Sequence, residues 1–162
     1  MLQDKVAVIY GAGPIGSTVA RAFADAGARV HLAGRTKPTL DAVADGIRAA
    51  SGEVRAHVVD ALDPVAVREH ADRVAAEAGR IDICFNLIGH GDVHGTALID
   101  MDVEDFARPI ESIVRSTFLT SQAAARHMVR RGSGVILFFG ASDHARTMTA
   151  ATLNISGGAV ID

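Results

Sequence analysis

Three glycines between an apolar run and a helical pattern have the spacing of a phosphate-binding loop. Gly11, Gly13 and Gly16 in the stretch YGAGPIGS follow the apolar residues VAVI and form G-x-G-x-x-G. In such a loop the first glycine permits a tight turn, the second lets the backbone approach phosphate, and the third lets helix pack on strand. The helix N-terminus adds free N–H groups. We therefore predict a dinucleotide pyrophosphate at these glycines and at Ile15; a strand-to-helix turn without ligand is the alternative.

A basic residue stands where a ribose-binding acid is usual. The second apolar run ends at Gly34-Arg35-Thr36, eighteen residues beyond Gly16, and carries no carboxylate there. A guanidinium pairs bidentately with phosphate oxygens and keeps its charge. Arg35, with Thr36 beside it, therefore predicts binding of a ribose 2′-phosphate, and so NADP(H) in preference to NAD(H), which stays possible. The alternative is a solvated surface arginine.

Two polar clusters follow the fourth and fifth apolar runs. His90, Asp92 and His94 form the first cluster, and Ser142–His144 the second. A histidine in such a loop can serve as a general acid or base near neutral pH. Solvated loop residues are the simpler interpretation of both clusters. Three polar residues in five specify no fourth metal ligand, so we expect no metal site.

Apolar runs alternate with amphipathic stretches along the chain, as in βαβ units. The predicted strands are 5–10, 28–34, 53–60, 81–89 and 135–139, and the predicted helices are 15–26, 38–50, 64–79 and 103–131, the last with a possible break at Pro109. This pattern predicts an α/β fold with a doubly wound parallel sheet in the order 3-2-1-4-5. The remaining residues read as polar and irregular up to 155–162, which begin a helix. Strand 135–139 would then be an exposed edge unless residues are missing or another chain covers it.

Composition narrows the class of protein. The chain has 162 residues, 49% of them apolar, which fits one globular domain over 1–162. The net charge of −3 disfavours a nucleic-acid partner. No apolar run reaches the roughly 18 residues of a membrane helix, and the N-terminus is no secretory signal. The single Cys84 reads as a buried, reduced thiol. We expect a cytoplasmic protein with a small-molecule ligand.

Several motifs in order resemble the short-chain dehydrogenase/reductase family. They are YGAGPIGS, Gly34-Arg35, Asp60, FNLIG, TFLTSQAAARHM and SGVILFFGAS. The resemblance implies a Rossmann-type fold lacking the family's last strands, in a chain that covers roughly the first two-thirds of a usual member. It also implies a homo-oligomer packed through the long helix. By position, Asp60 with Ala61 beside it matches the residues that meet the adenine, and Asn86 and Gly89 match the ends of the N-N-A-G that lies under the cofactor.

The sequence departs from the family at the catalytic positions. The family uses an Asn, a Ser, a Tyr and a Lys. In register these fall at Ile113, at Gly140 or Ala141, at Leu153 and at Gly157, with Ser142 one step beyond the Ser position. The glycine loop is also one residue shorter than the family's T-G-x-x-x-G-x-G, with Tyr10 in place of Thr. Ser142 and His90 are the candidates for an unconventional acid or base.

Two functions follow from these observations. The first is an NADP(H)-dependent oxidoreductase acting on an unidentified carbonyl or alcohol. The second is an inactive NAD(P)-binding sensor or scaffold, favoured by the missing Tyr and Lys. A metal-dependent hydrolase on the same fold would need ligands that the sequence does not place.

Overall fold

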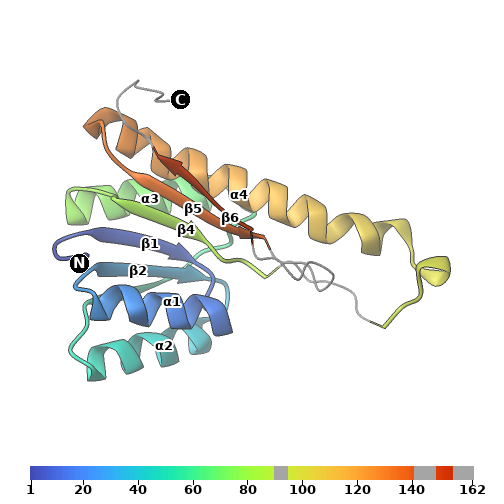
Figure 1. Cartoon of the computed structure of the whole chain (residues 1–162), viewed down its shortest axis with the longest axis horizontal. Coiled ribbons are helices and arrows are strands. Elements are labelled where there is room, and N and C mark those ends of the chain that lie inside the picture. Colours follow the sequence, from blue (N-terminus) through green and yellow to red (C-terminus); the bar gives the residue numbers. More distant parts are fainter. Residues whose placement is uncertain (90–94, 141–148, 155–162) are drawn as a thin grey trace.

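Six strands form one sheet between two layers of helices in the computed structural model, which describes residues 1–89, 95–140 and 149–154 (Figure 1). The strands are β1 (Val6–Tyr10), β2 (Arg29–Gly34), β3 (Val54–Val58), β4 (Ile83–Asn86), β5 (Val135–Gly140) and β6 (Thr149–Asn154). The helices are α1 (Pro14–Asp25), α2 (Lys37–Ala49), α3 (Pro64–Ala78) and α4 (Val103–Arg131), with a 3-10 turn, η1, at Leu98–Asp100. The order β3-β2-β1-β4-β5 and its parallel pairing confirm the predicted topology.

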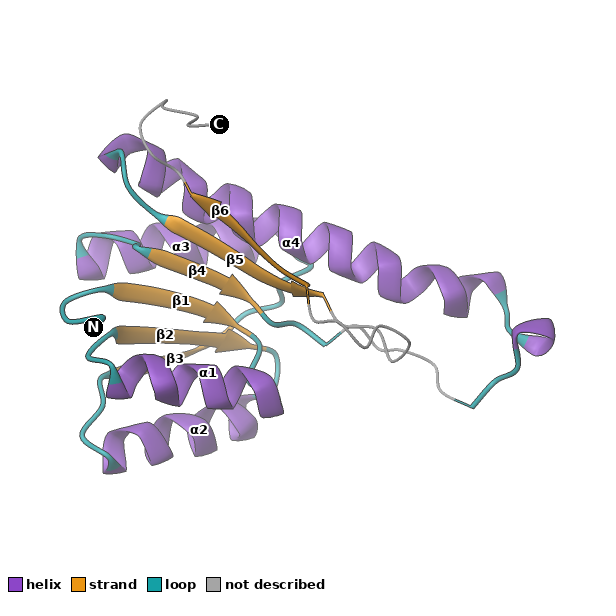
Figure 2. Cartoon of the chain, viewed as in Figure 1, coloured by secondary structure: helices purple, strands orange, loops and turns teal. Residues whose placement is uncertain are grey.

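Strand β1 is buried on both faces, which explains its unbroken apolar sequence. Val8 and Tyr10 face the core beneath α3 and α4. Ala7 and Ile9 face the opposite core, beneath α1 and α2. Side chains alternate along a strand, so one five-residue segment joins both cores. Figure 2 shows the two helical layers on either side of the sheet.

The far edge of the sheet differs from the prediction. We expected irregular chain after 135–139, but β6 pairs antiparallel with β5, from Val135 opposite Asn154 to Gly140 opposite Thr149. The physical reason is that β5 alone would present a row of unpaired N–H and C=O groups, which the returning strand satisfies. Segment 155–162, read as the start of a helix, lies outside the described residues.

The long helix is also less interrupted than predicted. α4 continues through Pro109 from Val103 to Arg131 and ends at Gly132, whose φ is +70°. A proline removes one backbone hydrogen bond. Here the position is in the second turn, and the helix beyond it packs on α3, β4 and β5. Pro109 therefore does not break the helix. No helix among residues 1–89, 95–140 and 149–154 has the length and apolar character to cross a bilayer.

The lone cysteine lies where its apolar context predicted. Cys84 is 1% exposed, and its thiol faces the Thr120 carbonyl at 3.6 Å. Burial raises the pKa of this thiol to about 12, so it stays protonated at neutral pH. Cys84 therefore acts as a small core side chain.

A buried carboxylate ties together the N-terminal ends of the central strands. Asp82 is 6% exposed and accepts hydrogen bonds from the Val6 N–H at 2.9 Å, from Arg80 Nε at 2.7 Å and from Arg131 Nη1 at 3.2 Å. Its own carbonyl accepts the Val135 N–H at 2.8 Å. Burial alone would raise the pKa of Asp82, but the hydrogen bonds from Arg80, Val6 and Arg131 outweigh it and hold the pKa below its usual value.

We expect Asp82→Asn to lower the free energy of unfolding by about 2 kcal/mol, because the two arginines lose their charged partner and one acceptor becomes a donor. Urea unfolding at pH 7 measures this. Asp45→Asn is the matched control, since the Asp45–Arg48 pair is exposed on α2 and should contribute well under about 1 kcal/mol. Equal losses in the two variants would contradict a structural role for Asp82.

Candidate functional site

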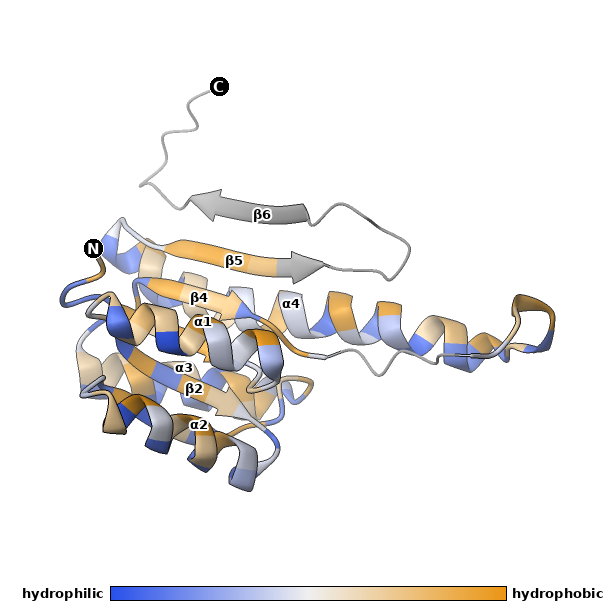
Figure 3. Ribbon diagram, turned by 60° about the horizontal axis from the view of Figure 1, so that its bottom comes forward, coloured by the Kyte–Doolittle hydropathy of each residue, from blue (hydrophilic) through white to orange (hydrophobic). Residues whose placement is uncertain are grey.

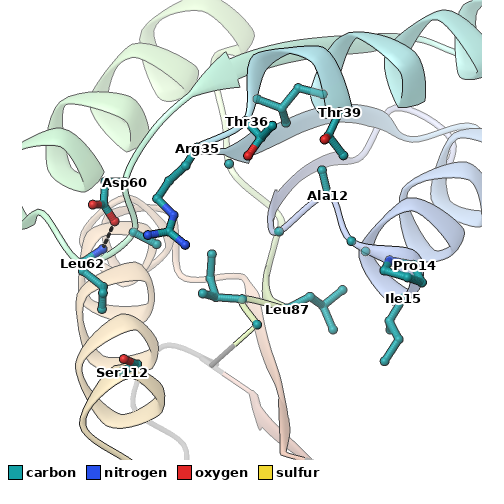
Figure 4. Close-up of a pocket in the computed structure, with 18 of the residues that line it drawn as sticks. Ala12, Pro14, Ile15, Arg35, Thr36, Thr39, Asp60, Leu62, Leu87 and Ser112 are labelled. Atoms are coloured by element: carbon teal, nitrogen blue, oxygen red, sulfur yellow. Dashed lines mark hydrogen bonds between the residues drawn. The ribbon is translucent and has the colours of Figure 1, made fainter. Parts of the chain in front are cut away.

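A cavity of about 670 Å³ lies at the C-terminal ends of β1, β2, β3 and β4, where the strand order reverses. Figure 4 shows its walls. Most of the predicted ligand residues line it: Gly11, Gly13, Ile15, Gly16, Arg35, Thr36, Asp60, Ala61 and Gly89. The cavity is also lined by residues that were not predicted as ligand contacts: Ala12, Pro14, Gly34, Thr39, Leu40, Leu62, Leu87, Ile88, Arg108 and Ser112.

Two glycines of the loop are required by the chain's own packing. Gly11 has φ +111°, and a Cβ there would collide with the Leu87 carbonyl oxygen. A Cβ on Gly16 would collide with the Gly11 carbonyl oxygen. The Gly11 N–H donates to the Ala33 carbonyl at 2.8 Å. These contacts bring β1, the start of α1 and the loop after β4 into direct backbone contact.

Gly13 differs from the other two, because nothing in the described structure lies within 4 Å of a Cβ built there. Its φ of −67° suits any residue, and it is the N-cap of α1 without a side-chain cap. The N–H groups of Ile15 and Gly16 donate to no acceptor among the described residues. The open space and the free donors fit a phosphate group at the helix N-terminus. The shortened loop thus keeps the open space and the donors that an anion would need.

Arg35 and Thr36 lie together at the rim beyond β2, as Figure 4 shows. Arg35 is exposed, and in the described part of the chain its guanidinium makes no ion pair. Thr36 is the N-cap of α2, yet its hydroxyl caps no backbone N–H. Both groups are therefore free to bind a ligand in the cavity.

The Asp60 carboxylate is held in place by its own loop. Its Oδ1 accepts the Leu62 N–H at 2.9 Å, and its backbone carbonyl accepts the Asp63 N–H at 3.1 Å. From α4, Arg115 Nε donates to the Leu62 carbonyl at 3.0 Å. Oδ2 of Asp60 has no partner among the described residues. One carboxylate oxygen is thus left to accept a hydrogen bond at the cavity wall.

Asn86 does not line the cavity, although the sequence placed it at the ligand. It is 5% exposed, and its Nδ2 donates to Ser116 Oγ at 3.0 Å and Thr117 Oγ1 at 3.2 Å. Its Oδ1 accepts the Ile88 N–H at 3.1 Å. The amide therefore fixes the loop 87–89 on α4, and that loop forms the wall. Its role as a ligand contact stays a prediction.

Helix α4 contributes two wall residues that the sequence analysis missed. Arg108 and Ser112 stand one helical turn apart and face the cavity. Arg108 Nη2 also pairs with Asp105 at 2.7 Å. The spacing of Arg108, Ser112 and Arg115 is helical, so the sequence indicates that they share one face of α4. Which face of α4 meets the cavity depends on how the helix crosses the sheet.

The candidate acid and base residues cannot be placed. His90 with Asp92 and His94, and Ser142–His144, lie outside the described residues, as does Gly157. Among the positions where the family has catalytic residues, Ile113 is half-buried on α4, and Leu153 lies in β6 opposite Ile136. Among residues 1–89, 95–140 and 149–154, no three histidine, cysteine or acidic side chains form a metal-binding group.

The five parallel strands β1 to β5, the glycine loop at the N-terminus of α1 and the carboxylate after β3 define a Rossmann-type nucleotide-binding domain. The sequence profile of the family described as short chain dehydrogenase matches residues 5–152. The chain belongs to the short-chain dehydrogenase family, a family of oxidoreductases that bind NAD(P).

Relatives and solved structures agree with this assignment. The chain is 32% identical over 160 residues to an uncharacterized oxidoreductase of Bacillus subtilis, covering 98% of this chain and 58% of that protein. It is 36% identical to the 7α-hydroxysteroid dehydrogenase of Escherichia coli over 84% of this chain and 52% of that one. The chain thus spans about half the length of these curated relatives.

Among solved structures, a short-chain type dehydrogenase/reductase from Mycobacterium marinum has a TM-score of 0.79 at 37% identity, over 93% of this chain and 62% of that one. A metagenomic short-chain oxidoreductase in complex with NADP has a TM-score of 0.75 at 32% identity, over 84% and 62% of the two chains.

The three loop glycines give a prediction that separates folding from binding. Gly13→Ala should fold with a melting temperature close to that of the parent, because its Cβ meets open space. NADPH affinity should fall by about tenfold or more, because the added methyl group keeps the pyrophosphate away from the N–H groups that would donate to it. Fluorescence titration measures the affinity.

Gly16→Ala should instead lower the melting temperature, because its Cβ collides with the Gly11 carbonyl. Gly46→Ala on α2, away from the cavity, is the control that should alter neither binding nor folding adversely. If Gly13→Ala bound NADPH as tightly as the parent, the phosphate position would be wrong.

Proposed function

We propose that the protein is an NADP(H)-dependent oxidoreductase that interconverts an alcohol and a carbonyl compound. The observation that supports this most strongly is the lining of the cavity. Arg35, which makes no ion pair among the described residues, lies on one side of it, and Pro14, the residue after the open position at Gly13, lies on the other (Figure 4). That arrangement fits a dinucleotide whose pyrophosphate lies at α1 and whose 2′-phosphate lies at the end of β2. The likeness to a structure solved with NADP supports the same cofactor.

The chain's own residues bind and orient the cofactor in this proposal. The N–H groups of Ile15 and Gly16 donate to the pyrophosphate. Arg35 and Thr36 bind the 2′-phosphate, and Asp60 Oδ2 accepts from the adenine amino group. Ala61 lies beside the adenine, and the apolar loop that includes Leu87 and Ile88 excludes water from the wall of the cavity. Gly89 ends that loop next to the cofactor.

The bound nicotinamide supplies or accepts the hydride. The chain must then supply a proton to the substrate oxygen, or remove one from it. Ser142 and His90 are the proposed groups, because in the sequence they come shortly after β5 and β4, and open α/β sheets bind ligands at the carboxyl ends of their strands. The printed names of two relatives, a 7α-hydroxysteroid dehydrogenase and a D-threitol dehydrogenase, favour an alcohol or carbonyl substrate.

The same proposal includes a homo-oligomer in the cytoplasm. An apolar stripe on α4, made of Phe106, Ile110, Val114 and Phe118, has exposed fractions of 51–63%. These residues recur every four positions and so share one helix face. Figure 3 shows α4 extending beyond the sheet with apolar residues along it. A second copy packed on this face would bury the stripe.

Replacing the rim arginine tests the cofactor. Arg35→Asp should weaken NADPH binding by about 10- to 100-fold, because a charge-assisted contact is replaced by repulsion between two anions. NADH binding should be unchanged or tighter. Parallel fluorescence titrations measure both. The control Arg48→Asp changes the same charge on α2 outside the cavity, and an unaltered preference in Arg35→Asp would contradict the 2′-phosphate assignment.

Turnover tests the activity. NADPH oxidation followed at 340 nm with a panel of ketones and aldehydes, including steroid ketones, should show turnover with at least one compound. Ser142→Ala or His90→Ala should then lower kcat by about 10²-fold or more, the usual contribution of a positioned acid or base. Binding of NADPH without turnover of any compound would contradict the oxidoreductase and favour a nucleotide sensor.

A further inference from the structure

Four aromatic rings form a buried chain on the α3 face of the sheet. Tyr10 Oη of β1 lies 3.0 Å from Nδ1 of His70 on α3. The His70 ring is 4.6 Å from the ring of His57 on β3, whose Nε2 lies 3.1 Å from Nδ1 of His31 on β2. His70, Tyr10 and His31 are 0%, 1% and 4% exposed, whereas His57 is half-buried. We call these residues the histidine chain.

The surroundings of the histidine chain do not accommodate additional positive charge. Arg29, Arg55 and Arg73 face it from β2, β3 and α3. Among the described residues one carboxylate faces it, that of Glu77 on α3, and this group pairs with Arg55 at 2.5 Å. Nε2 of His70 is buried without a partner among the described residues. In the described part of the chain, a proton on the His70 ring would therefore have no anion to balance it.

Tyr10, the member of the histidine chain that is not a histidine, also stays neutral. Cys84 of β4 faces Tyr10, and burial together with that thiol raises the pKa of Tyr10 well above its usual value. Tyr10 therefore remains protonated and hydrogen-bonded to His70. The nitrogens that face one another between His31 and His57 are likewise used in a hydrogen bond.

The histidine chain connects directly to the base of the glycine loop. The Tyr10 carbonyl accepts the Leu87 N–H at 2.7 Å, and Gly11 follows it in sequence. Helix α3, which carries His70, begins at the Asp63 cap, directly after the loop that holds Asp60. A displacement of α3 would thus disturb both the glycine loop and the Asp60 loop.

We propose that the histidine chain is an acid-sensitive lock. Protonation of its rings separates α3 from the sheet and so disrupts the glycine loop and the Asp60 loop at the cavity. The consequence for nucleotide rests on the proposed function, whereas the lock itself does not. His57 is the ring nearest solvent and is the entry point for protons.

The direction of the pH effect follows from the folded and unfolded states. Burial, aided by His57 and Arg55, lowers the pKa of His31 to about 4. Burial, aided by His57 and His31, lowers the pKa of His70 to about 3, and burial with Arg73 also lowers the pKa of His57. Histidine in an unfolded chain has a pKa near 6.5. Below about pH 6.5 the unfolded state therefore binds more protons, and stability is lost as pH falls toward 4.

Urea unfolding of the chain without nucleotide, at pH values from 7.5 to 4.5, tests the lock. Each buried histidine should lower the folding equilibrium constant by about tenfold per pH unit below pH 6. His31→Phe keeps the ring stack but cannot take up a proton. Its folding equilibrium constant should therefore fall less steeply with pH than the parent's, by about one factor of ten per pH unit. His57→Gln, at a half-buried position, provides a second variant if His31→Phe does not fold.

The control is His127→Gln, whose imidazole lies 2.8 Å from the Asp72 carboxylate instead of against other rings. This variant removes a histidine without touching the histidine chain, so a change of slope that it shares with His31→Phe would not belong to the chain. The acidic residues common to all variants contribute equally. If both His31→Phe and His57→Gln show the parent's slope, the proposal is overturned.

A second arm measures NADP⁺ binding by calorimetry at pH 7.5 and pH 5. In the parent, binding should be lost in step with unfolding, and in His57→Gln it should persist to lower pH. If the variants differ from the parent in how stability depends on pH but NADP⁺ does not bind at pH 7.5, the proposed function is refuted and the lock is supported. NADP⁺ binding with identical slopes would refute the lock alone.

Discussion

The close approach of three backbone segments at the C-terminal end of β1 is the constraint on which the site depends. Gly11 contacts the Leu87 carbonyl, and Gly16 contacts the Gly11 carbonyl. Any side chain at either position would force these segments apart. The contact places the N-terminus of α1 beside the loop after β4, and it fixes the direction of the free N–H groups at Ile15 and Gly16.

Much of this arrangement was predictable from the sequence, because the determining signals are local. The G-x-G-x-x-G spacing, the alternation of apolar runs with helical patterns and the Gly-Arg-Thr after the second run are all short-range features. They correctly predicted the parallel order of five strands. Nine of the ten residues predicted to bind the cofactor line the cavity, and these nine make up just under half of its lining. The buried state of Cys84 followed from its apolar context in the same way.

The features that escaped prediction depend on which segments meet in space. Strand β6 pairs across a hairpin, and its sequence TAATLN shows no alternation that would mark a strand. The role of Asn86 is set by Ser116, thirty residues away, and the contribution of Arg108 is set by the crossing of α4. His31, His57 and His70 carry no signal in the sequence, because the pairing of β2 with β3 brings the first two rings together and the packing of α3 adds the third.

The Asp82 cluster and the cavity lie at opposite ends of the same strands. A strand of five residues spans roughly 16 Å, so substitutions at the two ends share no contacts and their effects should add independently. A chain built this way can gain or lose stability at one end while the other keeps its ligand specificity. The stability supplied by the Asp82 cluster therefore limits how many destabilising substitutions the cavity can accumulate. A divergent member of the family can then change its binding loop and still fold.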